Sequence, residues 1–289
     1  MDETLAAHLI GAQFPALAGL PVRRLASPGT VNALFRVGER LVARFPFAAA
    51  SEAELHAEAE ALAEFARASP FPASEPVGVG APTEQHPSAW SVQTWVPGEP
   101  ATPDGQSDSD AAADDLVTLI GALRKVDMRG RTFDGRGRGG DLRDHEEWMA
   151  LCFRRSAHLL DADRAARLWA RLRELPRAEA DAMCHRDLIP PNLLVVAGRL
   201  AGVLDAGAFG PADPALDLVG AWHLCDGVRR ERVRHGLRVD DAEWLRGAAW
   251  ALQQAMGLGW YYERSNPAMS ALGVSTMRRL LSDPELAAG

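Results

Sequence analysis

The feature that most restricts the fold of this chain is a group of polar residues that leads directly into a predicted hairpin. These polar residues are His185, Asp187 and Asn192, in the spacing H-x-D-x-x-x-x-N. An apolar run over 193–196 and a mostly apolar run over 199–204 follow, with Ala197-Gly198 between them, and Asp205 comes next. This pattern predicts two antiparallel strands joined by a two-residue turn, with polar side chains at their open end.

The predicted hairpin places chemically related side chains close together. If Ala197-Gly198 is the turn, Asn192 lies opposite Val203 and is a diagonal neighbour of Asp205, about 7 Å away. Amide and carboxylate oxygens are the hard ligands that Mg²⁺ takes, so we predict Asp205 as its principal ligand and Asn192 as its second. Asp187, on the preceding loop, is the candidate base for a hydroxyl. The alternative is a capping loop beside a purely structural hairpin.

The N-terminal part begins with another predicted hairpin, in which strands over 31–37 and 40–45 flank a turn at Gly38-Glu39. Ser51 and Glu54 then have the spacing of a capping box, and they begin a helix that Pro70 and Pro72 stop. We therefore expect a small sheet with one helix in this region.

Glu58 lies on the predicted helix, three residues after one leucine and four before another, and therefore faces the apolar stripe. A carboxylate on that face needs a partner, and Arg44 on the second strand is the nearest plausible cation in the sequence. The alternative is a solvated residue at the margin of the stripe.

Beyond the N-terminal part, an apolar run over 90–96 is broken at 97–100 by Pro-Gly-Glu-Pro, which is typical of a connection between lobes. Apolar residues at helical spacing dominate the remainder, for example Leu116, Leu119, Ile120 and Leu123. The chain of 289 residues is long enough for two cores. We predict an α+β fold with lobes at 1–98 and 99–289, the second mostly helical.

Composition limits the partners of this chain. Its formal charge of −8 argues against a nucleic-acid partner, and it either suits a cationic ligand or reflects ordinary solubility. No stretch holds the roughly 18 apolar residues of a membrane span, and the acidic start lacks the base of a secretory signal. We expect no membrane association and a cytoplasmic location. The three separated cysteines, Cys152, Cys184 and Cys225, are expected to be reduced and buried.

The stretch from Cys184 to Trp222 resembles the aminoglycoside and macrolide phosphotransferase family of protein-kinase-like enzymes. In that family a catalytic loop, a metal-binding Asp and an Asp-Pro-x-x-Asp segment occur in this order, and here the last is Asp213 to Asp217. The likeness extends through the N-terminal hairpin, the hinge at 95–99 and Asn266-Pro267. It implies a two-lobe kinase fold, with nucleotide binding in the first lobe and catalysis in the second.

The resemblance also implies roles in nucleotide binding. It places Arg44 where kinases have the lysine that holds the nucleotide phosphates, with Glu58 as its ion-pair partner, and Arg keeps the charge while changing its geometry. The loop before the first hairpin, which contains Gly29 and Thr30, would cover the phosphates. The residues expected along the hinge side of the nucleotide are Gln93, Thr94, Trp95 and Val96.

Other residues are assigned to structural support. By the resemblance Asp217 braces the catalytic loop, and His185 is expected to orient the loop rather than carry protons. Asp213 has the pattern of a helix N-cap with Pro at the first helical position. The sequence departs from the family at Arg186, where glycine is common, and after Asp205, where an aromatic residue is usual.

Two further features bear on the ligands. Gly135, Gly137 and Gly140 match G-x-G-x-x-G, but no strand precedes them, so we predict a mobile loop near the substrate rather than a dinucleotide site. The residues that we predict to line an acceptor pocket, with core packing as the alternative, are Asp226, Trp250, Tyr261 and Tyr262.

The function predicted from these patterns is transfer of a phosphoryl group from ATP or GTP, with Mg²⁺, to a hydroxyl of a small molecule. The resemblance implies that this acceptor is an antibiotic, which phosphorylation would inactivate and so give resistance. A kinase for a metabolite such as an amino alcohol or a sugar is the alternative, and a non-catalytic pseudokinase is a third. Side chains alone leave open the acceptor, the modified hydroxyl, the nucleotide and the choice between monomer and homodimer.

Overall fold

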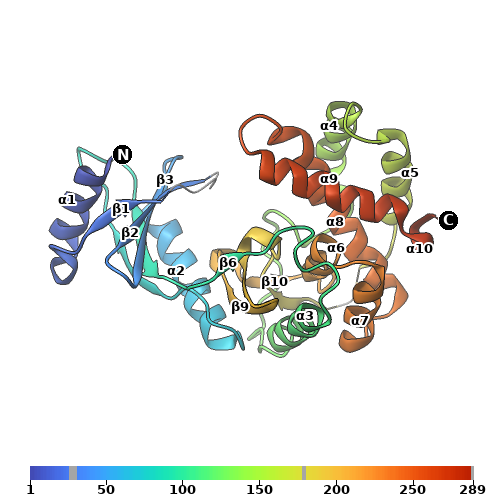
Figure 1. Ribbon diagram of the computed structural model, residues 1–289, viewed down its shortest axis with the longest axis horizontal. Helices are drawn as coiled ribbons and strands as arrows, with labels where there is room; N and C mark the ends of the chain where they lie inside the picture. Colours follow the sequence, from blue (N-terminus) through green and yellow to red (C-terminus); the bar gives the residue numbers. More distant parts are fainter. Residues whose placement is uncertain (26–30, 178–179, 288–289) are drawn as a thin grey trace. The chain divides into compact units, whose positions relative to one another are not determined.

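A computed structural model describes residues 1–25, 31–177 and 180–287 (Figure 1). The chain divides into two compact units. The first comprises Met1–Arg67, Pro72–Pro97 and Val203–Ala208, and the second comprises Ala68–Phe71, Gly98–Gly202 and Phe209–Gly289. Relative to the predicted ranges 1–98 and 99–289, a short segment that contains Asp205 joins the first unit. Within the described residues no helix is both long and apolar enough to cross a membrane.

The first unit is built on one antiparallel sheet of five strands in the order β1-β2-β3-β5-β4. Its strands are β1 (Val22–Arg24), β2 (Asn32–Val37), β3 (Leu41–Pro46), β4 (Pro76–Gly80) and β5 (Trp90–Thr94). Its helices are α1 (Glu3–Gln13) and α2 (Glu52–Ala68), with a short 3-10 turn at Pro15–Leu17. The predicted first hairpin is confirmed, because β2 pairs with β3 from Asn32 opposite Pro46 to Val37 opposite Leu41.

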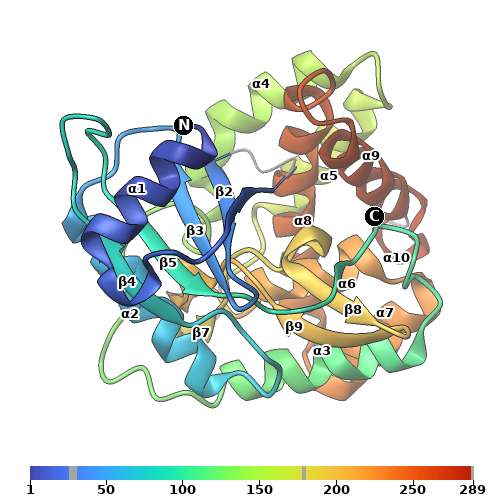
Figure 2. The same cartoon turned by 60° about the vertical axis from the view of Figure 1, so that its left-hand side comes forward.

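Alternation along β2 and β3 decides what each face of this sheet holds. Phe35 and Phe45 point into the core, where α1 lies across the sheet and contributes Leu9 and Ile10 (Figure 2). The ring of Phe45 also stacks on that of Trp90, with centroids 4.8 Å apart. Since successive side chains of a strand alternate between faces, Arg44, which precedes Phe45 on β3, points away from this core.

The helix α2 begins with the predicted capping box. The backbone N–H of Glu54 donates to Ser51 Oγ at 3.2 Å, and Glu54 Oε2 accepts from the backbone N–H of Ser51 at 2.9 Å. Its apolar stripe buries Leu55, Leu62 and Phe65, and the helix ends at Ala68, before the prolines. These reciprocal bonds satisfy donors that a helix N-terminus otherwise leaves unpaired.

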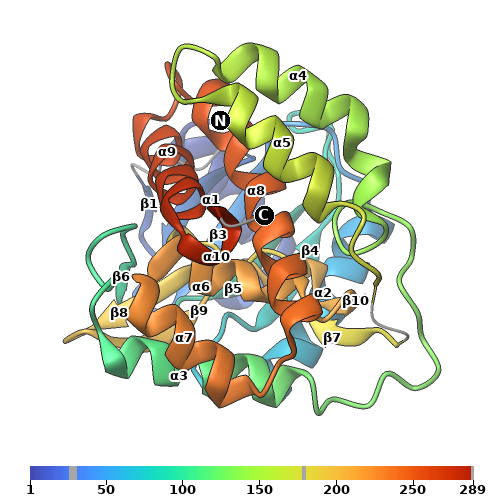
Figure 3. The same ribbon diagram turned by 90° about the vertical axis from the view of Figure 1, so that its right-hand side faces the viewer.

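The second unit is mostly helical, as predicted. Its helices are α3 (Asp110–Leu123), α4 (Glu146–Ser156), α5 (Ala162–Leu172), α6 (Val219–Leu224), α7 (Gly227–Leu237), α8 (Asp241–Tyr261), α9 (Pro267–Ser282) and α10 (Pro284–Ala287). The central one is α8, which packs against α4, α5, α6 and α9 (Figure 3). Short 3-10 turns of this unit lie at Leu142–His145, Pro190–Asn192 and Leu216–Leu218, and the one at Ala206–Ala208 belongs to the first unit. The three cysteines are free and buried, as predicted.

Two small sheets hold the segments around the polar motif. Strands β6 (Glu99–Pro100), β8 (Leu193–Val196) and β9 (Arg199–Val203) form one sheet, and β7 (Ala182–Cys184) pairs with β10 (Gly210–Ala212) in the other. The turn between β8 and β9 has positive φ at both Ala197 (50°) and Gly198 (76°). Positive φ at both central residues is the geometry of a type I′ hairpin turn, so the predicted two-residue turn is confirmed.

The core of the second unit contains a buried ion pair. Asp213 and Arg246 are 0% and 3% exposed, and Asp213 Oδ2 accepts from Arg246 Nε and from the indole N–H of Trp250, each at 2.9 Å. We predicted Asp213 as a helix N-cap, and this is wrong. Its Oδ1 accepts from the backbone N–H of Ala215 at 3.1 Å, while its other oxygen is held by Arg246, so it closes a turn before a 3-10 segment.

We expect Arg246→Ala to lower the free energy of unfolding by about 3 to 5 kcal/mol, because it leaves the carboxylate of Asp213 buried without its cation. Chemical denaturation followed by circular dichroism measures the change. Arg143→Ala is the matched control, since Arg143 pairs with Asp141 at the surface, and it should have a far smaller effect. Equal effects of the two substitutions would contradict this interpretation of the buried pair.

Candidate active site

The carboxylate of Asp187 is held by three side chains of the second unit. Its Oδ1 accepts from Arg138 Nη2 and from Gln254 Nε2, both at 2.7 Å. Its Oδ2 accepts from Asn192 Nδ2 at 3.0 Å. The Asp187 side chain is 30% exposed. The structure thus brings Asp187 and Asn192 together and adds Arg138 and Gln254, which the sequence did not reveal because they lie 49 and 67 residues away.

The loop that carries Asp187 is braced from behind by Asp217. This carboxylate is 1% exposed and accepts the backbone N–H groups of His185 at 2.7 Å and of Arg186 at 2.9 Å. Burial raises the pKa of Asp217, while His185 and the two backbone donors oppose that shift. His185 is itself fully buried, and its Nδ1 accepts the backbone N–H of Asp187 at 3.2 Å. Both side chains therefore fix the backbone of the loop.

The backbone of the loop passes through a left-handed conformation just before Asp187. Arg186 has φ of 72°, a region that glycine enters without steric cost and that other residues enter rarely. This conformation explains why glycine is common at the position in the family. The Asp217 bond to the Arg186 N–H helps to hold the strained backbone in place.

Gln254 is oriented by a buried chain of polar groups that runs from α9 through α6 to α8. Since a carboxylate only accepts, Gln254 must direct its amide N–H at Asp187 and its Oε1 at His223 Nε2, 3.0 Å away. Burial lowers the pKa of His223 to about 4, so the ring is neutral and its single N–H is on Nε2. Nδ1 then accepts the hydroxyl of Thr276 at 2.7 Å.

Arg44, predicted for the nucleotide phosphates, and Asp205, predicted as the principal metal ligand, both lie in the first unit. Arg44 Nη2 donates to Asp205 Oδ1 at 2.7 Å, and the side chain of Asp205 is 49% exposed. Asp205 has φ of 61°, a left-handed conformation that Asp tolerates better than most residues. Asn192 belongs to the second unit, so its predicted approach to Asp205 stays a prediction.

Arg44 differs from its predicted pairing. We predicted Glu58 as its ion-pair partner, but the guanidinium hydrogen-bonds Asp205 instead. Glu58 remains within electrostatic reach: desolvation raises its pKa, the charge of Arg44 lowers it, and Asp205 raises it. The side chain of Arg44 reaches the carboxylate of Asp205, which follows β9. Sequence spacing could not show this contact, because 161 residues separate Arg44 from Asp205.

The other predicted nucleotide residues lie at the end of β5. Gln93 and Val96 are buried, and Thr94 Oγ1 accepts the backbone N–H of Glu75 at 2.8 Å. The ring of Trp95 lies 3.9 Å from the guanidinium carbon of Arg36. Gly29 and Thr30 lie outside the described residues. The nucleotide roles of these residues stay predictions.

The predicted acceptor residues do not form one cluster. Trp250 is 0% exposed and bonds Asp213, so its assignment to a pocket is wrong, and the core alternative holds. Asp226 caps α7 through the N–H of Arg229 and pairs with that side chain at 3.3 Å. Tyr261 is 60% exposed, and its ring meets that of Tyr262 at 4.9 Å.

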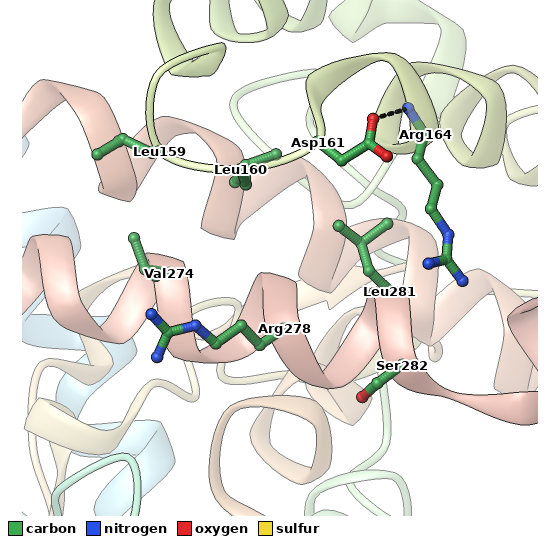
Figure 4. A pocket seen from close by; sticks show the side chains of 8 residues that line it. All are labelled: Leu159, Leu160, Asp161, Arg164, Val274, Arg278, Leu281 and Ser282. Carbon is green, nitrogen blue, oxygen red and sulfur yellow. Dashed lines mark hydrogen bonds between the residues drawn. The ribbon is translucent and has the colours of Figure 1, made fainter.

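A groove of about 440 Å³ lies between the α4–α5 connection and α9 (Figure 4). It is lined by Leu159, Leu160, Asp161, Arg164, Val274, Arg278, Leu281 and Ser282. These lining residues include none of those predicted for the active site. In Figure 4 the carboxylate of Asp161 turns to the backbone N–H of Arg164, which it accepts at 2.9 Å as the cap of α5.

An antiparallel sheet unit, a helical unit and a braced H-x-D-x-x-x-x-N loop are together the features of kinase-like phosphotransferases. Comparison with known families agrees. The model of the phosphotransferase enzyme family (APH) matches residues 22–250, and the chain belongs to this family. Among curated proteins, no sequence matches it.

Solved structures share the fold. The GDP complex of aminoglycoside 2'-phosphotransferase-IIIa superposes with a TM-score of 0.69 at 17% identity, covering 96% of this chain and 98% of that one. The GDP and kanamycin complex of APH(2")-IIia gives a TM-score of 0.70 at 18% identity, with 98% of each chain covered. Macrolide 2'-phosphotransferase MphH from Brachybacterium faecium gives 0.63 at 16% identity, again with 98% of each chain covered.

We expect His223 to make the protein less stable in mild acid. Its folded pKa of about 4 lies below its unfolded value of 6.5, so the stabilising neutral form is complete above pH 6.5 and is lost as the pH falls toward 4. The loss amounts to about 3 kcal/mol over this window. Denaturant unfolding of the wild type and of His223→Gln at several pH values measures it. Parallel curves for the two proteins would rule out this role of His223.

Proposed function

We propose that this protein transfers the γ-phosphoryl group of a nucleoside triphosphate to a hydroxyl of a small molecule, with Asp187 as the base. The observation that carries the proposal is the uneven bonding of the Asp187 carboxylate. Two donors hold Oδ1, whereas Asn192 alone bonds Oδ2 among the contacts described. A carboxylate oxygen accepts about two hydrogen bonds, so Oδ2 keeps one position for the acceptor hydroxyl.

In the proposed reaction Asp187 orients the acceptor hydroxyl and takes its proton on Oδ2. A bond forms between the acceptor oxygen and the γ-phosphorus, and the bond from that phosphorus to the β–γ bridging oxygen breaks. The other oxygen of the carboxylate cannot swing away, because Arg138 and Gln254 hold it. The protein therefore contributes mainly orientation and charge, as phosphoryl transfer requires.

The proposed nucleotide contacts follow the family. Arg44 would bind the phosphates, with Glu58 beside it, and Gly29, Thr30 and residues 93–96 would complete the site. Mg²⁺ would be held by Asp205 and Asn192. The amide nitrogen of Asn192 bonds Asp187, so its harder atom Oδ1 is the one suited to a metal. When bound, the metal neutralises charge on the triphosphate.

The choice of co-substrate and acceptor is supported by the neighbours alone. Their structures include GDP, ADP and ATP complexes, so we propose ATP or GTP. Neighbours bind kanamycin, gentamicin or streptomycin, and others are macrolide phosphotransferases, so we propose a hydroxylated antibiotic acceptor. A metabolite kinase is the second candidate. Asp187, Asn192 and Asp205 disfavour a pseudokinase, because each has a side chain suited to the chemistry.

The decisive experiment is a modification screen. The purified protein is incubated with Mg²⁺, ATP or GTP and a panel of hydroxylated antibiotics and metabolites, and mass spectrometry looks for a gain of about 80 daltons, one phosphoryl group. We expect Asp187→Ala and Asp205→Ala each to reduce turnover by about 100-fold or more while folding persists. Asp108→Ala, which removes an exposed carboxylate, should retain full activity. Near-normal turnover by either of the first two variants would refute the assigned roles.

Arg44→Ala should weaken nucleotide use by roughly ten- to a hundredfold in kcat/KM, because a charge-assisted bond to phosphate is lost. Acceptor KM should stay within about twofold, since the residue lies in the first unit. Steady-state kinetics with each substrate varied in turn separates the two effects. The control is Arg23→Ala, which removes an exposed arginine from β1 of the same sheet. An unchanged nucleotide KM and kcat for Arg44→Ala would contradict the assignment.

A further inference from the structure

The glycine-rich segment over 133–140 is anchored at both ends. The backbone N–H of Phe133 donates to Asp181 Oδ2 at 2.8 Å, and the carbonyl of Gly139 accepts the backbone N–H of Asp213 at 2.9 Å. Gly139 has φ of 117°, and a Cβ on it would lie 2.6 Å from that of Ala212. Only glycine permits this approach, so the segment, which we predicted to be a mobile loop, is tied to β10.

Arg186 holds the middle of the same segment. Its guanidinium donates to the backbone carbonyl of Arg136, reaches that of Arg138 at 3.4 Å, and lies 5.1 Å from the ring of Phe133. It also lies 3.4 Å from the carboxylate of Asp134. The glycine that is common at position 186 would make none of these contacts. The arginine therefore fixes the backbone from which the side chain of Arg138 projects.

The side chain of Arg138 ends at the proposed base. Its guanidinium is 2.7 Å from Asp187 Oδ1, and both side chains are 30% exposed. The negative charge of the base is thus already compensated, and solvent reaches the pair. The carboxylate that we predicted as an acceptor contact, Asp226, is also engaged, because it caps α7 and pairs with Arg229.

We propose that Arg138 is a specificity-determining residue, which makes the acceptor site favour hydroxyls on neutral or anionic molecules over polycations such as aminoglycosides. This inference rests on the proposed function. An acceptor whose hydroxyl approaches Asp187 places its neighbouring groups beside the Arg138 guanidinium. Ammonium groups there are repelled, and in a partly solvated site one such repulsion weakens binding by about tenfold.

The test is binding of kanamycin as a polycationic probe. Calorimetry at low ionic strength compares the wild type with Arg138→Gln and with Arg136→Gln, which removes an equal charge from the same segment. The side chain of Arg136 is not among those that bond Asp187. We expect Arg138→Gln to bind kanamycin about tenfold more tightly than the wild type, and Arg136→Gln to differ from it by less than about twofold. The gain should come from attraction of the cationic probe to the carboxylate of Asp187 once its charge is no longer compensated. It should therefore disappear in the double variant Arg138→Gln/Asp187→Asn, which lacks that carboxylate.

The inference is overturned if Arg138→Gln binds kanamycin no more tightly than Arg136→Gln, including the case in which none of the proteins binds. It is also overturned if the gain survives in the double variant, since the probe then binds elsewhere. Thermal unfolding checks each variant. If Arg138→Gln unfolds early, Arg138→Met, which also removes the charge beside Asp187 and keeps a long side chain, is the second variant and should show the same gain. Failure of the proposed function appears separately, as no phosphoryl gain on any acceptor.

Discussion

The bond between the buried carboxylate of Asp217 and two successive backbone N–H groups is the constraint on which the active-site loop depends. It allows residue 186 to stay in a left-handed conformation, and that conformation turns Asp187 toward Asn192, Arg138 and Gln254. Without the brace, the backbone would relax, and the base would lose its fixed orientation. Burial disfavours the charged form of Asp217 and raises its pKa. The two backbone N–H groups that its oxygens accept offset part of this cost.

Much of this fold was readable from the sequence because its signals are local. The capping box at Ser51, the type I′ turn at Ala197-Gly198 and the apolar stripe of α3 each depend on residues a few positions apart. The sequence failed where partners are distant. Nothing local indicated that Arg138 and Gln254 meet at Asp187, that Arg44 bonds Asp205, or that Trp250 belongs to the core through Asp213.

The arginine at position 186 illustrates how a backbone requirement and a side-chain contact compete. Glycine would meet the left-handed φ at no steric cost, yet only a long cation can bond the carbonyls of the segment over 133–140. The backbone at Arg186 is strained, but its side chain orders the segment over 133–140 beside Asp187. A departure from the family pattern that seemed minor in the sequence therefore changes which groups surround the reacting oxygen.

The polar chain behind Gln254 also links the base to a distant helix. Because His223 is neutral, each donor in the chain has one direction only, from Thr276 on α9 to the ring, from the ring to the amide, and from the amide to Asp187. Loss of the Thr276 hydroxyl would leave ring Nδ1 without its donor, while the carboxylate of Asp187 still requires the amide N–H of Gln254. The firmness with which Gln254 is held against the base thus depends in part on a residue that never touches the loop.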